Sequence, residues 1–204
     1  MNVQIYLDMD GVLTDFESFL IEFVFANKEE LEEKLQAKIV KTDCLDSLRS
    51  SLGVKWYQLT AGLEKSFWEE MPYLEGAKDF LKYLGSMDEF IILSTPASSK
   101  NSREGKIAWI QRELGENQKF IIQPYKERFV KNDLLVPSNK LRNPGFCKLL
   151  IDDTPRVLEK WVDSGGLGIL FDGDYSVLRD RCESVFDSQV SGLPEREFFF
   201  KNAN

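Results

Sequence analysis

The sequence predicts an α/β fold, in which a doubly wound parallel sheet carries a small helical subdomain inserted after the first strand. Two observations predict it. Short, strand-like apolar runs alternate with helical patterns along most of the chain, and a mostly helical stretch interrupts that alternation once, near the start. Strands that alternate with helices are typical of a parallel sheet covered on both faces. The 204 residues suffice for one such domain with an insert and are few for two independent domains.

Five short apolar runs are predicted as buried strands. The first covers residues 3–7 and ends directly before Asp8. The others cover residues 90–93, 120–122, 148–151 and 167–170. Helical patterns lie between them, over residues 75–84, 102–114 and 155–164. The last of these begins with Pro155 and stops at two glycines, as helices prefer.

The stretch from residue 17 to residue 70 breaks this rhythm, because it is mostly helical and contains no convincing strand. We therefore predict an α/β core formed by residues 1–16 and 71–204, with residues 17–70 as a helical cap. The charged segment 28–34 is expected to be a solvated helix face, with Asn27 as its N-cap. Asp15 is expected to cap the helix that follows it. The tail residues 198–200 are expected to form a strand or a packing segment.

The composition indicates an ordinary soluble globular protein, with 43 % hydrophobic and 29 % charged residues. No apolar run approaches the roughly 20 residues that span a bilayer, and the first residues do not resemble a signal peptide. The three cysteines lie far apart, which favours a reduced, cytoplasmic protein. A formal net charge of −8 argues against duplex nucleic acid as the main partner, since phosphate backbones attract basic surfaces.

The absence of histidine narrows the possible chemistry most. It excludes a Ser-His-Asp or Cys-His mechanism and any zinc site that uses imidazole. Acid–base chemistry must fall to Asp, Glu, Lys, Tyr or Cys. The abundance of carboxylates favours aspartate acting with a hard metal ion.

Acidic and hydroxyl side chains follow three of the predicted strands. Ligands of open α/β sheets bind outside the carboxyl ends of the strands, so these side chains are expected to meet there. The sets are Asp8 and Asp10, then Ser94 and Thr95, then Asp152 and Asp153. Crowded carboxylates repel one another, and a divalent cation with oxygen ligands offsets that repulsion. Mg²⁺ suits such a site, because it takes a few carboxylates and bridges to phosphate.

These segments resemble the motifs of the haloacid dehalogenase-like (HAD) phosphatases, whose core is a Rossmann-like sheet. The matches run in order along almost the whole chain: residues 8–13, Ser94, Lys106 as a candidate for the third motif, and Asp152 with Asp153. More narrowly, residues 8–16, 94–96, 105–109 and 149–155 resemble the 5'(3')-deoxyribonucleotidase branch. Residues 17–66 show little similarity to the cap of that branch.

The resemblance implies roles for the acidic residues. Asp8 would be the nucleophile that forms an aspartyl-phosphate. Asp10 would protonate the leaving oxygen, later deprotonate the attacking water, and give its backbone carbonyl to the metal. Asp152 and Asp153 would complete the Mg²⁺ site, and we favour Asp152 as the direct ligand.

The resemblance also implies substrate contacts. Ser94 and Thr95 would hydrogen-bond the phosphate and Lys106 would neutralise it. Lys126 or Arg128, after the third strand, is an alternative that supplements or replaces Lys106. In the cap, the candidates for holding the rest of the substrate are Phe16, Phe67 and Trp68.

The function implied is that of a magnesium-dependent phosphomonoester hydrolase, a 5'(3')-nucleotidase that releases phosphate from nucleoside monophosphates. Three alternatives stay open: a phosphatase for another small phosphorylated metabolite, a 3'-phosphatase of nucleic-acid ends, and a non-catalytic phosphate- or nucleotide-binding protein of the same fold. The acidic balance disfavours the second. The sequence leaves the preferred base and sugar open, and also the oligomeric state, of which a dimer is one option.

Overall fold

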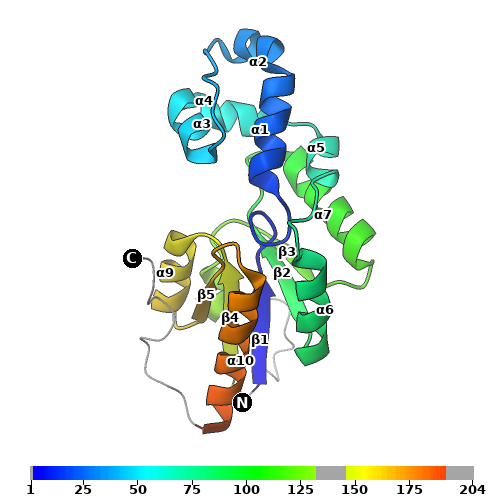
Figure 1. Cartoon of the computed structure of the whole chain (residues 1–204), viewed down its shortest axis with the longest axis vertical. Helices are drawn as coiled ribbons and strands as arrows, with labels where there is room; N and C mark the ends of the chain where they lie inside the picture. The colour runs from blue at the N-terminus through cyan, green and yellow to red at the C-terminus, as the bar shows by residue number, and fades with distance from the viewer. Residues whose placement is uncertain (1, 132–145, 192–204) are drawn as a thin grey trace. The chain divides into compact units, whose positions relative to one another are not determined.

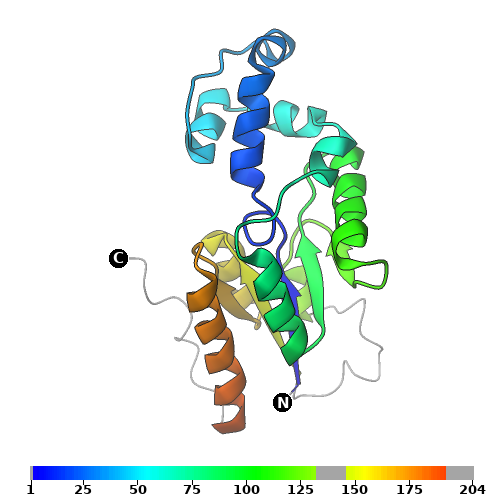
Figure 2. The ribbon, with the colours of Figure 1, turned by 45° about the vertical axis from the view of Figure 1, so that its right-hand side comes forward.

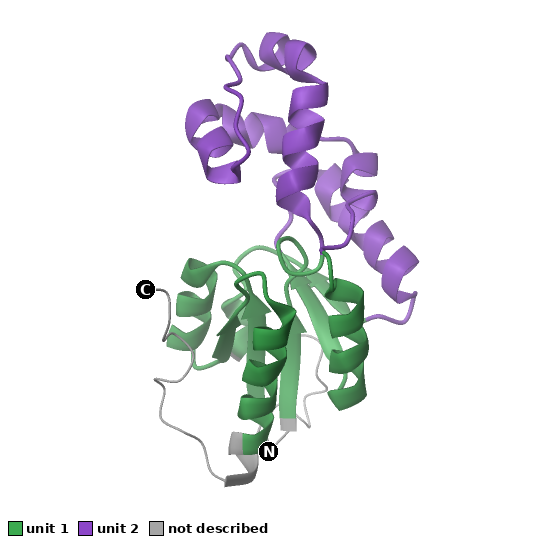
Figure 3. Ribbon diagram, viewed as in Figure 1, with its two compact units in different colours: residues 1–13, 75–94, 119–204 green, residues 14–74, 95–118 purple. Residues whose placement is uncertain are grey.

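The computed structural model describes residues 2–131 and 146–191. The expected strand or packing segment at residues 198–200 lies outside this range. The chain forms two compact units, which Figure 3 colours separately. Unit 1 contains residues 1–13, 75–94 and 119–204, and unit 2 contains residues 14–74 and 95–118.

Unit 1 is built on a five-stranded sheet in the order β3-β2-β1-β4-β5 (Figure 1). All four strand pairs are parallel, which confirms the predicted sheet. The strands cover β1 (Asn2–Leu7), β2 (Phe90–Ser94), β3 (Phe120–Ile122), β4 (Phe146–Asp152) and β5 (Leu167–Leu170). Each predicted strand is present, with ends that differ by two residues at most.

The register of the central strands brings their carboxyl ends to one level. Leu7 of β1 is paired with Ile92 of β2 on one side and with Ile151 of β4 on the other. Beyond Leu7, the backbone N–H of Asp8 donates to the carbonyl of Ile151 at 2.9 Å. Asp8 therefore emerges beside Asp152, the last residue of β4.

Helices of unit 1 cover both faces of the sheet (Figures 1 and 2). Side chains alternate along a strand, so even-numbered residues of β1 and β4 share one face. On that face α8 (Arg128–Lys131) and α9 (Pro155–Asp163) contribute to a buried cluster with Tyr6 and Leu150. The remaining two, α6 (Ala77–Met87) and α10 (Tyr175–Ser191), pack together through the rings of Phe80 and Tyr175, whose centres lie 5.4 Å apart.

Unit 2 is helical, as expected for residues 17–70. Its helices are α1 (Phe16–Ala26), α2 (Lys28–Leu35), α3 (Leu45–Leu52), α4 (Lys55–Gly62), α5 (Lys65–Glu69) and α7 (Lys100–Leu114). The last of these was expected to belong with the core. It packs closely on α5, since a Cβ at Gly105 would lie only 2.5 Å from Cβ of Trp68. The role of residues 17–70 as a cap stays a prediction.

Local details of unit 2 test three sequence expectations. Asp15 caps α1 as predicted, because its Oδ1 accepts from the N–H of Ser18 at 3.1 Å. Asn27 was expected to cap α2, and this was wrong. Its side-chain amide donates instead to the carbonyl of Phe23 at 2.8 Å, which closes α1. The charged face of α2 is exposed, as expected, at Glu29, Glu30, Glu33 and Lys34.

The three cysteines, Cys44, Cys147 and Cys182, are free thiols. Within the described residues, none of the helices combines the length and the apolar character needed to cross a bilayer.

Candidate active site

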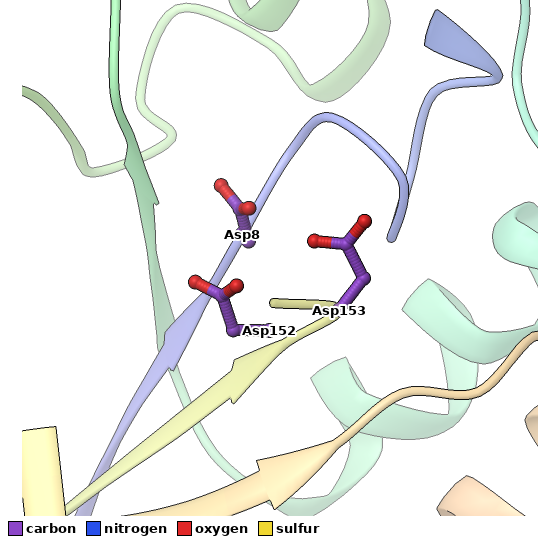
Figure 4. Close-up of side chains that lie close together, drawn as sticks. All are labelled: Asp8, Asp152 and Asp153. Carbon is purple, nitrogen blue, oxygen red and sulfur yellow. The ribbon is translucent and has the colours of Figure 1, made fainter. Parts of the chain in front are cut away.

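Three carboxyl groups meet at the carboxyl edge of the sheet. One oxygen each from Asp8, Asp152 and Asp153 lies within 4.8 Å of the other two. Figure 4 shows these groups projecting to the same side, one from the end of β1 and two from the end of β4. The two strands are neighbours, so the parallel register alone brings the acids together.

A lysine ammonium bridges two of these acids. Nζ of Lys126 lies 2.6 Å from Oδ1 of Asp8 and 2.7 Å from Oδ2 of Asp152. The lysine is 4 % exposed and belongs to the loop between β3 and α8. Burial by itself would lower the pKa of Lys126, but the two carboxylates more than reverse this and raise it. Lys126 is therefore a fixed positive charge in this site.

The two β4 acids are held by Thr154, whose backbone N–H donates to Oδ1 of Asp152 at 2.9 Å and whose hydroxyl donates to Oδ1 of Asp153 at 3.1 Å. Burial, together with the negative charge of Asp8, raises the pKa of Asp152 to about 6. Burial and the charges of Asp8 and Asp152 raise the pKa of Asp153 to about 7. Ionisation of all the acids in the site is therefore unfavourable unless a further cation is bound.

The loop after Asp8 is tight. Gly11 has a left-handed backbone, with φ of +75°, and a Cβ there would lie 2.1 Å from Oδ2 of Asp153. The hydroxyl of Tyr175 donates to the carbonyl of Val12 at 2.5 Å and holds the loop from the side of α10. Asp10 lies on this loop and is partly buried, and its carboxylate is not a member of the three-acid group.

The donor set fits a hard divalent cation. Asp8, Asp152 and Asp153 offer carboxylate oxygens, the ligands that Mg²⁺ prefers. Lys126 balances one of the three formal negative charges and leaves two, the charge of such an ion. Two of the three acids, Asp8 and Asp152, are buried, where uncompensated charge is costly.

Two other predicted site residues lie in unit 1. Ser94 ends β2 and is 1 % exposed, and its carbonyl accepts from the N–H of Gln123 at 3.0 Å. Arg128 is exposed on α8, with its guanidinium 4.4 Å from the ring centre of Tyr125.

The remaining predicted residues lie in unit 2. Lys106 is fully buried, and its Nζ donates to the carbonyl of Thr95 at 2.8 Å and lies 5.4 Å from the ring centre of Trp68. Phe16 stacks on Trp68 at 5.6 Å between ring centres. Trp68 and Phe67 are buried in this aromatic cluster, whereas Phe16 is partly exposed.

Sequence reasoning missed two residues that support the site, Tyr175 and Lys148. Tyr175 carries no local signal, because its contact with Val12 spans most of the chain. Lys148 did carry one, since a lysine within an apolar strand needs a partner for its charge. Its partners are the backbone carbonyls of Phe129 and Val130.

No protein-family model matches the chain, and no curated protein matches its sequence. Solved structures do match. A HAD-superfamily hydrolase from Ehrlichia chaffeensis has a TM-score of 0.53 and 15 % identity over 89 % of this chain and 97 % of that one. A HAD-superfamily hydrolase of subfamily IA from Geobacter sulfurreducens PCA has a TM-score of 0.52 and 12 % identity over 83 % and 89 %. A hydrolase from Streptococcus pneumoniae TIGR4 has a TM-score of 0.51 and 14 % identity over 90 % and 100 %.

These similarities show the fold, which is the Rossmann-type α/β fold of HAD-superfamily hydrolases. They confirm the predicted fold class. At such low identities they do not address the nucleotidase branch.

Proposed function

We propose that this chain is a phosphomonoester hydrolase that depends on a divalent cation, Mg²⁺, and that it acts through an aspartyl-phosphate on Asp8. One observation carries the proposal. The carboxylate of Asp8 lies beside the ammonium of Lys126 and within 4.8 Å of two further acids. A nucleophile, a fixed positive charge and ligands for a hard cation are the parts that phosphoryl transfer needs.

In the first step a carboxylate oxygen of Asp8 attacks phosphorus in line, and the bond from phosphorus to the leaving oxygen breaks. Lys126 neutralises charge on the transferred group and orients the carboxylate of Asp8. Asp8, Asp152 and Asp153 would hold the metal ion, which when bound supplies further neutralisation of the phosphoryl oxygens.

Asp10 would serve as the general acid and base. It protonates the leaving oxygen as the ester bond breaks and then removes a proton from the water that hydrolyses the aspartyl-phosphate. The backbone around Asp10 is fixed by the left-handed turn at Gly11 and by the bond from Tyr175 to Val12, which favours a defined position for this carboxyl group.

We assign the third-motif role to Lys126 in place of Lys106. The support is geometric, since the ammonium of Lys126 bridges Asp8 and Asp152, whereas that of Lys106 is bonded to the carbonyl of Thr95. Ser94 and Thr95 as phosphate ligands, and Arg128 as an additional positive charge, remain predictions from the sequence.

For the substrate we propose a nucleoside monophosphate, on the strength of the sequence resemblance to the deoxyribonucleotidase branch. Phe16 is the aromatic residue proposed to help select it, because it is partly exposed while Phe67 and Trp68 are buried. Another small phosphorylated metabolite is the alternative. We place the chain in the cytoplasm because all three cysteines are free.

A panel of nucleoside and sugar monophosphates, with free phosphate as the readout, tests this function. Activity is expected with Mg²⁺ and not with EDTA, and Asp8→Asn is expected to lose it by several powers of ten. If the rates on sugar phosphates exceed those on every nucleotide, the chain is a phosphatase for another phosphorylated metabolite and not a nucleotidase. Full activity of Asp8→Asn, or activity unchanged by EDTA, would refute the mechanism.

A further inference from the structure

The segment formed by residues 126–130 is hydrogen-bonded to β4 at both of its ends. Near its start, Lys126 bonds to Asp152 at the carboxyl end of β4. At its other end, Nζ of Lys148 donates to the carbonyls of Phe129 at 2.7 Å and Val130 at 2.9 Å, within the short helix α8. Lys148 and Asp152 are four residues apart on β4, so their side chains lie on the same face of the sheet.

Between these two sets of hydrogen bonds, the segment also packs against β4 through apolar side chains. Phe129 is 6 % exposed and belongs to a buried cluster with Tyr6, Leu150 and Trp161. Leu150 lies between Lys148 and Asp152 on the same face, and the indole N–H of Trp161 donates to the backbone carbonyl of Lys148 at 3.3 Å. The segment is therefore held against β4 along its length.

The backbone of the segment takes a path that needs such support. Tyr125, directly before Lys126, is a non-glycine residue with φ of +63°. This left-handed conformation costs free energy for a bulky side chain and persists where the surroundings impose it. A hydrogen bond from the N–H of Gln123 to the carbonyl of Ser94 holds the chain before Tyr125, and Lys148 holds it after.

We propose that Lys148 is a positioning residue for the reaction, which anchors α8 so that the ammonium of Lys126 lies between Asp8 and Asp152. This inference rests on the proposed function. An ammonium suits the task, because the last carbonyls of a helix have no partner within the helix and Lys148 supplies two donors to them. Without those donors, the hydrogen bonds that hold α8 to β4 are lost, and the bonds of Lys126, the packing of Phe129 and the bond from Gln123 must resist the strain at Tyr125 without them.

The experiment compares Lys126→Met, Lys148→Met, the double variant and Lys148→Arg with the wild type. Lys119→Met serves as the control, because Lys119 is an exposed lysine of the same unit that pairs with Glu89. Three quantities are measured: kcat and KM for a phosphomonoester, and the affinity for Mn²⁺ alone, by titration without substrate. Circular dichroism checks folding, and Lys148→Gln, which keeps an N–H donor group but is shorter and uncharged, replaces Lys148→Met if that variant does not fold.

We expect Lys148→Met to lower kcat by about 10-fold to 100-fold, the cost of a misplacement of roughly 1 Å. In the Lys126→Met background the same change is expected to alter kcat by less than about twofold, since its effect passes through Lys126. Lys148→Arg should restore most of the activity, and Lys119→Met should behave as wild type.

Mn²⁺ affinity gives a readout that does not depend on catalysis. Removing the ammonium of Lys126 is expected to tighten Mn²⁺ binding several-fold, because it competes with the cation for Asp8 and Asp152. Lys148→Met should also tighten Mn²⁺ binding, and the double variant should bind Mn²⁺ with the same affinity as Lys126→Met alone. If the wild type hydrolyses no phosphomonoester while this pattern holds, the proposed function fails and the positioning stands. Wild-type kcat and Mn²⁺ affinity in Lys148→Met, or effects that multiply in the double variant, would overturn the positioning.

Discussion

Asp153 occupies the space that a side chain at position 11 would need, because a Cβ on Gly11 would lie 2.1 Å from Oδ2 of Asp153. The glycine has a second reason to be there, since its φ of +75° disfavours any other residue. The first-strand loop and the β4 acids therefore fit together only with glycine at this position.

Gly11→Ala is expected to displace Asp153, one of the three acids that would hold the metal ion, and therefore to lower both kcat and Mg²⁺ affinity by about 10-fold or more. Steady-state kinetics and metal titration measure the two effects. Gly173→Ala is the matched control, because Gly173 has a similar φ of +97° and open space where its Cβ would lie. It should cost about 1 kcal/mol of stability and leave kcat intact. Equal effects of the two variants on kcat would argue against the contact with Asp153.

Lys126→Met is expected to lower kcat by about 10²-fold to 10³-fold, the usual cost of removing a group that stabilises charge in the transition state. Lys106→Met should act mainly on stability, by about 1–3 kcal/mol, because it leaves the carbonyl of Thr95 without the bond that Lys106 donates. Kinetics and urea unfolding separate these effects. A larger loss of kcat in Lys106→Met than in Lys126→Met would return the third-motif role to Lys106.

The stability of the metal-free protein should fall as the pH rises from about 4 to about 7. The pKa values of Asp152 and Asp153 are raised from 3.8 to about 6 and about 7, so the folded protein binds these protons more tightly than the unfolded chain. The stability that this tighter proton binding contributes is present in full below the unfolded-state pKa of 3.8, and it is lost as the pH rises through about 6 and about 7. Tm in EDTA measures it, and Asp153→Asn should flatten the dependence.

Mg²⁺ should reverse this trend, because the cation binds the ionised acids. The increase in Tm on adding Mg²⁺ is expected to be larger near pH 8 than near pH 5, about the range over which the two acids lose their protons. An increase that is equal at both pH values would contradict the assignment of these acids as metal ligands.

One thiol should react quickly with a disulfide reagent and two slowly. Cys44 is exposed, whereas Cys182 is fully buried and Cys147 partly so. Burial raises the pKa of Cys147 to about 11 and, with the nearby charge of Glu183, that of Cys182 to about 12, which leaves little thiolate to react. The time course in native buffer and in urea measures the rates, and Cys44→Ser should remove the fast phase.

The sequence predicted the sheet well because strand formation in a buried parallel sheet follows from local apolar runs. Each of the five runs forms a strand, and the acids after β1 and β4 meet because parallel strands end at one edge. The prediction for Asn27 failed because an N-cap needs the side-chain oxygen to accept from a backbone N–H of the helix that follows, whereas this side chain donates from its amide nitrogen to the carbonyl of Phe23 on the preceding helix.

The lysine of the site was harder to assign. Lys106 and Lys126 both follow strand-like runs, and a sequence does not tell which long side chain folds back over the sheet. The decision depends on the left-handed turn at Tyr125 and on the tie from Lys148 to α8. Both are set by contacts between distant segments, which local patterns do not encode.

Trapping the covalent intermediate is the sharpest test of whether Asp8 is the nucleophile. The protein is mixed with substrate and Mg²⁺, quenched in acid and reduced with borohydride, which converts an aspartyl-phosphate to homoserine, and the peptide containing residue 8 is then sequenced by mass spectrometry. We predict homoserine at Asp8, formed only when substrate and Mg²⁺ are both present. Phosphate release under the same conditions without modification of Asp8, together with an active Asp8→Asn variant, would contradict the account.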